Sequence, residues 1–149
     1  MVKRWTREEL IAELDTTWAQ YPQRLAALPA AEQRRFAQQQ GCPRPPDVLA
    51  HLGAWLAEAI RVLPYLQRDE RPPRDYANDA QFNARVLERF HAATWDEVSD
   101  WYEQQRSGLR QHLIDLPPEA MPITRLYRWL VGTLVDHYDE HRLPERTEP

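Results

Sequence analysis

Apolar residues recur every three or four positions along most of the chain, which is the spacing of one face of an α-helix. The first stripe follows Thr6-Arg7-Glu8-Glu9, a capping box that starts a helix. Pro22 lies inside the stripe and predicts a kink about one turn upstream, whereas Pro29 ends it. The apolar positions of this first predicted helix are Leu10, Leu14, Trp18, Tyr21, Leu25 and Leu28.

Prolines and charged residues separate the remaining apolar stripes. Residues 36–46 are polar and proline-rich and predict a connection, after which Asp47 is expected to open a second long helix that continues to about Pro64. Residues 67–78 are charged, contain Pro72-Pro73 and predict a loop. A short helix is expected at about 79–92.

Two more long helices complete the predicted fold. The capping box Thr94-Trp95-Asp96-Glu97 starts the third, which Pro117-Pro118 stops, and the last covers about 123–142. The chain is therefore predicted to be all-α, a four-helix bundle with a short extra helix in the connection between the second and third long helices. We expect a single domain over residues 1–149, with a charged, disordered tail at 143–149.

Composition narrows the classes of partner. The 149 residues, 42% hydrophobic, suffice for one core, and the formal net charge of −4 argues against nucleic acid as the main partner. No apolar run is long enough to span a membrane, and the N-terminal residues do not resemble a signal peptide. The single cysteine, Cys42, fits a reducing compartment, so a cytoplasmic location is expected.

Two of the five histidines fall on the core-facing side of the last predicted helix. At about 100° per residue, His137 and His141 lie in the same arc as the leucines at 126, 130 and 134. Two histidines four residues apart can present their nitrogens to one metal ion. The alternative is that both sit at a frayed helix end, bonded to water or carboxylates.

His51 lies one turn into the second predicted helix, at the edge of its apolar arc. It can meet His137 and His141 only if the second and fourth long helices are antiparallel. The connection of about 28 residues from Gln67 to Thr94 is long enough to let the second and third helices run parallel, which gives that arrangement. His51 alone could equally be a boundary residue, and surface or boundary packing is expected for His91 and His112.

Three stretches resemble the DinB/YfiT-like superfamily of small bacterial four-helix bundles: DVLAHLGAW at 47–55, LVDHYDEH at 134–141 and FNARVLERFHAATWDEV at 82–98. The resemblance implies an up-down-down-up topology and a divalent metal held by His51, His137 and His141. Relatives include enzymes that use small thiols such as mycothiol or bacillithiol. The middle segment and first helix are also similar to the ClbS/DfsB branch, which protects cells against a reactive genotoxic product and generally lacks the three histidines.

Three hypotheses for the function follow. The first is a metalloenzyme, a thiol-dependent transferase or a hydrolase acting on a small molecule, because three imidazoles leave a coordination position open on Ni²⁺, Zn²⁺ or Fe²⁺. The second is a metal-free protective or binding protein of the ClbS/DfsB kind, and the third is a non-catalytic bundle that associates, for example as a homodimer.

Side chains beside the predicted metal site could assist its chemistry. Glu58, seven residues after His51, is a candidate acid or base, and Trp55 and Tyr138 could form walls of a pocket, although a solvated glutamate and core aromatics would fit the same positions. The expected partner is a small-molecule substrate, with a low-molecular-weight thiol as one option, rather than nucleic acid or a membrane.

Overall fold

The computed structural model describes residues 2–145, and these residues form helices and connections without a β-strand. The all-α prediction is therefore confirmed. The helical segments are α1 (Arg7–Glu13), a π-helical segment (Leu14–Trp18), α2 (Ala19–Ala26), α3 (Ala30–Gln39), α4 (Pro45–Gln67), α5 (Asp79–Arg89), α6 (Trp95–Ile114), a 3₁₀ turn (Pro118–Ala120), α7 (Thr124–Val131), a second π-helical segment (Gly132–Asp136) and α8 (His137–Glu140). Among the described residues, no helix is both long and apolar enough to cross a bilayer.

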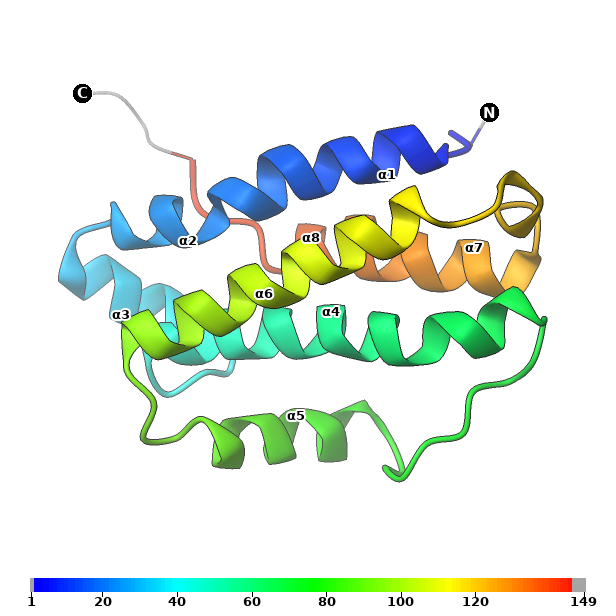
Figure 1. Cartoon of the computed structure of the whole chain (residues 1–149). Helices are drawn as coiled ribbons and strands as arrows, with labels where there is room; N and C mark the ends of the chain where they lie inside the picture. Colours follow the sequence, from blue (N-terminus) through cyan, green and yellow to red (C-terminus); the bar gives the residue numbers. More distant parts are fainter. Residues whose placement is uncertain (1, 146–149) are drawn as a thin grey trace.

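Helix α4 lies in the middle of the molecule, with α5 below it and with α6 and the segment α7–α8 above it in the view of Figure 1. In this view α4 and α6 run in one direction along the molecule, whereas α1–α2 and α7–α8 run in the other. Close approach of α6 to α4 requires Gly53, because a Cβ atom there would lie 2.6 Å from Cζ3 of Trp101. The apolar faces of these helices form one core.

The kink expected upstream of Pro22 coincides with the π-helical segment Leu14–Trp18. Proline has no N–H group and cannot donate to the carbonyl four residues before it, which is that of Trp18. The buried hydroxyl of Tyr102 donates to this carbonyl instead, at 2.7 Å. A side chain of α6 thus satisfies a backbone group that the proline leaves without its usual helical donor.

Replacing Tyr102 with Phe is expected to lower the free energy of unfolding by about 1–3 kcal/mol, because the buried carbonyl of Trp18 would lose its donor. Urea unfolding followed by circular dichroism measures this change. Tyr65→Phe is the matched control, since Tyr65 is only partly buried. Equal stability of Tyr102→Phe and the wild type would show that the hydroxyl contributes nothing.

The predicted connection over residues 36–46 is wrong in its first part. Residues up to Gln39 belong to α3, whose Phe36 and Ala37 are buried in the core. Helix α4 also begins before Asp47, at Pro45, because Asp47 reaches back as a cap: the backbone N–H of Arg44 donates to Asp47 Oδ2 at 2.9 Å. The polar composition of this region concealed a short amphipathic helix with only two buried residues.

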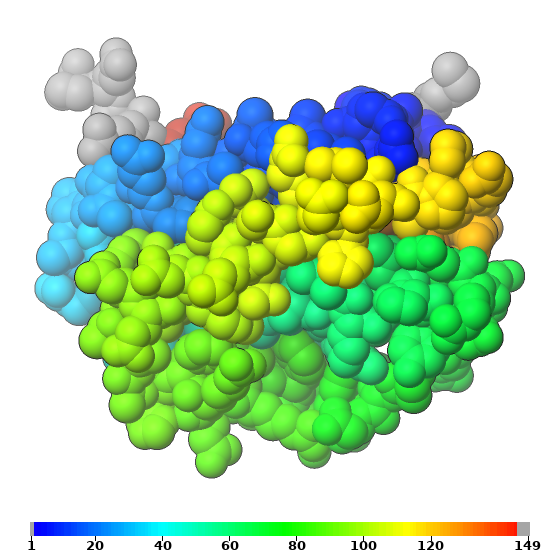
Figure 2. All heavy atoms as spheres, viewed as in Figure 1, coloured from blue at the N-terminus to red at the C-terminus, as the bar shows by residue number. Residues whose placement is uncertain are grey.

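The short helix predicted between the second and third long helices is confirmed as α5, which begins where Asn78 Oδ1 accepts from the N–H of Gln81. Residues of α5 and the connection before it form a continuous surface beside α6 in Figure 2. At the other end of the chain, Leu143 is only 3% exposed and packs in the core, so the predicted disordered tail starts too early. Residues 146–149 of that tail lie outside the described part of the chain.

Candidate metal centre

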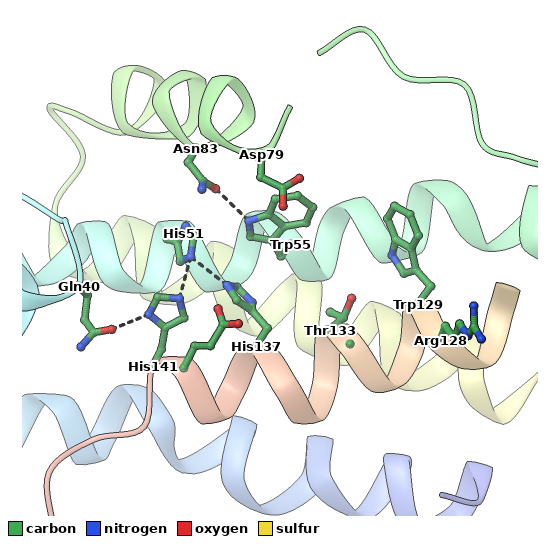
Figure 3. A pocket seen from close by; sticks show the side chains of 12 residues that line it. Gln40, His51, Trp55, Asp79, Asn83, Arg128, Trp129, Thr133, His137 and His141 are labelled. Atoms are coloured by element: carbon green, nitrogen blue, oxygen red, sulfur yellow. Dashed lines mark hydrogen bonds between the residues drawn. The ribbon is translucent and has the colours of Figure 1, made fainter. Parts of the chain in front are cut away.

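Three histidine side chains from distant parts of the sequence meet beside α4 (Figure 3). Nε2 of His51 lies 2.9 Å from Nε2 of His137 and 3.0 Å from Nε2 of His141. The ring centroids form a nearly equilateral triangle, with separations of 4.9, 4.7 and 4.7 Å. These three histidines therefore lie close enough together to bind one metal ion.

Contacts with the first helical segment fix the backbone that carries His137 and His141. The π-helical segment Gly132–Asp136 immediately precedes His137, and its Leu134 carbonyl accepts a hydrogen bond from Trp18 Nε1 at 3.0 Å. His141 follows the last turn of α8, and its own carbonyl accepts from the Tyr21 hydroxyl at 2.6 Å. Both contacts join residues more than 100 positions apart, so the site depends on the packing of the whole domain.

Gln40 orients one of the three rings. Its Oε1 atom lies 2.7 Å from Nδ1 of His141, and an amide oxygen can only accept, so Nδ1 of His141 carries the proton. The Nε2 atom of a neutral His141 then presents a lone pair to the other two histidines (Figure 3). Hydrogen bonding of the outer ring nitrogen is how proteins commonly fix a metal-binding imidazole.

The environment keeps all three imidazoles neutral. Burial, together with the neighbouring histidines, lowers the pKa of His51 to about 4 and that of His137 to about 3. Burial also lowers the pKa of His141, although the charge of Glu140 acts in the opposite direction. Neutral imidazoles are the form that binds metals, so the site is prepared for a cation rather than for protons.

These lowered pKa values predict how the stability of the metal-free protein depends on pH. Unfolded histidines take up protons near pH 6.5, whereas folded His51 and His137 resist protonation down to about pH 4 and 3. The free energy of unfolding is therefore highest above about pH 6.5, where these histidines are neutral in both states. It decreases as the pH falls towards 4, because only the unfolded state then takes up protons. We therefore expect the melting temperature to fall over this interval in the presence of a chelator.

His137→Leu should make this pH dependence shallower, because it removes one group whose pKa differs between the folded and unfolded states. His91→Leu is the control, since His91 is exposed. Thermal unfolding of the three proteins between pH 7 and 4.5 makes the comparison. Identical slopes for wild type and His137→Leu would contradict the burial argument.

A cavity of about 530 Å³ opens beside the three histidines. Trp55 forms one wall, where its Nε1 donates to Asn83 Oδ1 of α5 at 3.0 Å and its ring packs against Phe82 at 4.3 Å between centroids. Two carboxylates, those of Asp79 and Glu140, also line the cavity. The size suits a small molecule, and the helix α5 supplies part of the wall.

Other residues singled out in the sequence lie elsewhere. The structure does not bring Glu58 to the histidines: it is 4% exposed, its carboxylate binds Arg61, and it lines a different cavity. Tyr138 faces the core, where its ring contacts Trp18 and Tyr21, and does not line the cavity. Both His91 and His112 are exposed, as expected.

Sequence reasoning missed several residues of this site. Gln40 fell in the supposed connection, and Asn83 lies in the short helix, where only apolar spacing was considered. Arg128 and Trp129 carry no motif. Glu140 could have been found, because it directly precedes His141 and its carboxylate lines the cavity.

No protein family, curated protein or solved structure matches the chain.

Proposed function

We propose that the protein is a metal-dependent enzyme that acts on a small molecule, with one divalent transition-metal ion held by His51, His137 and His141. The observation that carries this proposal is the convergence of three Nε2 atoms at one edge of an open cavity. Three imidazoles with a free coordination position are typical of catalytic rather than structural metal sites. Zn²⁺, Ni²⁺ and Fe²⁺ all accept this set of ligands.

The arrangement of the nitrogens fits a cation better than it fits hydrogen bonds alone. Nε2 of His51 is in contact with two other nitrogens at once, yet one ring nitrogen carries either a single proton or a single lone pair. One proton cannot satisfy both contacts, whereas one cation can accept a lone pair from each ring. The observed 2.9 and 3.0 Å are also close to the about 3.3 Å expected between two nitrogens on one tetrahedral zinc ion.

The bound ion would act as a Lewis acid that lowers the pKa of a water molecule or a thiol. The residues of the chain then have separate roles. Glu140 and Asp79 can accept a proton inside the cavity, and the ring of Trp55 forms one of its walls. This proposal includes transferase or hydrolase chemistry and the use of a low-molecular-weight thiol. It also includes a DinB-like up-down-down-up bundle and a cytoplasmic location.

Metal analysis of protein purified without an affinity tag tests the proposal. We expect close to one divalent transition-metal ion per chain, and a higher melting temperature when Zn²⁺ or Ni²⁺ is added to chelator-treated protein. Absence of metal together with no thermal shift would contradict it. Such a result would favour the metal-free alternative, a protein that binds or traps a reactive small molecule.

Gln40→Ala is expected to weaken Zn²⁺ binding by about 10–100-fold, because the proton on Nδ1 of His141 would lose its acceptor. Competition with a chromophoric chelator measures the affinity. Gln39→Ala is the control, since Gln39, the last residue of α3 and the neighbour of Gln40, is exposed and does not line the cavity. If both variants bind zinc like the wild type, Gln40 does not orient the ligand.

A further inference from the structure

A second cavity, of about 610 Å³, adjoins the one beside the histidines, and Arg128 and Trp129 line both. Its described lining residues include five arginines and a single carboxylate, that of Asp69. The arginines come from α4, from the connection after it and from α7: Arg61, Arg71, Arg74, Arg125 and Arg128. A strongly cationic cavity is notable in a chain whose formal net charge is −4.

Three of these arginines are held in place by neighbouring groups. Arg61 donates to the carbonyl of Pro73 at 2.8 Å and binds Glu58. Arg74 donates to the carbonyl of Ala77 at 3.2 Å, and Arg125 lies 3.7 Å from Asp69. Arginines fixed in this way lose little side-chain freedom when a ligand binds.

The side chains of the other two, Arg71 and Arg128, form no hydrogen bond or ion pair with any residue in the described part of the chain. They are therefore free to bind an anion with the planar guanidinium group, which suits carboxylate and phosphate oxygens.

Backbone and indole donors add to this pattern. Helix α7 begins at Thr124, which lines the cavity, and no side chain of the described residues caps this end of the helix. No capping side chain therefore competes with an anion for the positive end of the helix dipole. Nε1 of Trp129 is buried and has no acceptor among the described residues. Figure 3 shows Trp129 and Arg128 along the same run of helical turns as His137 and His141, at the far end of the first cavity.

We propose that the arginine cavity binds an oxyanion with at least two negative charges, a phosphate ester or a polycarboxylate group of a small molecule. The shared wall formed by Arg128 and Trp129 places such a group beside the cavity of the histidines. One molecule could then bind with its anionic part among the arginines and its reactive part at the histidines. Only this last step rests on the proposed function.

The test uses calorimetric titration of the full-length, chelator-treated protein with pyrophosphate and, separately, with citrate, at low ionic strength. We expect at least one probe to bind, and the tighter one identifies the kind of oxyanion. Arg71→Gln and Arg128→Gln should each weaken binding roughly tenfold, because each removes charge-assisted hydrogen bonds. Arg35→Gln removes the same charge from an exposed position on α3, outside both cavities, and should leave binding unchanged.

Three results would overturn this inference. The first is that neither probe binds, and the second is that Arg35→Gln weakens binding as much as Arg128→Gln does. The third is that His137→Ala abolishes binding while Arg128→Gln does not. The last result would place the probe at the histidines. Because the titrations use metal-free protein, retention of anion binding in His137→Ala supports the arginine cavity even if the metal proposal fails.

Discussion

Replacing His137 with alanine should reduce the affinity for Zn²⁺ by more than the roughly 10–100-fold that loss of an outer hydrogen-bond partner costs, because one of three ligands disappears. His51→Ala and His141→Ala should have effects of similar size. The double variant His51→Ala/His137→Ala should lose little more than either single variant, since ligands that act as a unit are non-additive. Calorimetric titration of the metal-free proteins provides these affinities.

Two exposed histidines provide matched controls for this series. His91 follows α5 and His112 lies in α6, and both side chains are exposed. The variants His91→Ala and His112→Ala each remove one imidazole and should bind zinc like the wild type. A different pattern would contradict a metal site made of three histidines. If His51→Ala binds zinc as tightly as the wild type while His137→Ala does not, only a two-histidine surface site exists, and the enzymatic proposal should be withdrawn.

Trp18→Ala should produce the largest loss of stability, about 3–5 kcal/mol in the free energy of unfolding. Trp18 is fully buried, and its ring packs against Tyr102 and Tyr138. Its Nε1 atom also donates to the carbonyl of Leu134, three residues before His137, so the substitution would leave a cavity and remove this hydrogen bond. Chemical unfolding followed by circular dichroism measures the effect.

Two further variants separate packing from hydrogen bonding in this prediction. Trp18→Phe keeps much of the ring volume but loses the donor, so its stability should lie between those of wild type and Trp18→Ala. Trp95→Ala, at a partly exposed position at the start of α6, should cost less than Trp18→Ala. Equal losses for Trp18→Ala and Trp95→Ala would show that burial at Trp18 is not the cause.

The helical class and most helix positions could be predicted because apolar spacing and capping residues are local signals. Thr6 and Thr94 cap α1 and α6 as their neighbours in sequence suggested. Helix α3 was missed because only Phe36 and Ala37 of its residues are buried, which is too weak a stripe to recognise.

The three histidines could be grouped from sequence because spacing and topology both placed them at one end of the bundle. The residues that form hydrogen bonds with these histidines could not be predicted. Gln40, for example, is 101 positions from His141 in the sequence, and no local pattern records such a contact. Glu58 was misplaced for the opposite reason: its spacing from His51 suggested a shared side of α4, yet Arg61, three residues later, binds its carboxylate in another cavity. Helical spacing gives a direction around the axis but says little about what lies opposite.

Anomalous diffraction from crystals grown with Zn²⁺, recorded on both sides of the zinc absorption edge, shows whether the three histidines bind one metal ion. We expect one strong anomalous peak bonded to Nε2 of His51, His137 and His141, at about 2.0–2.1 Å from each nitrogen. A peak that contacts only His137 and His141, or no peak beside these three side chains while zinc is bound elsewhere, would contradict it.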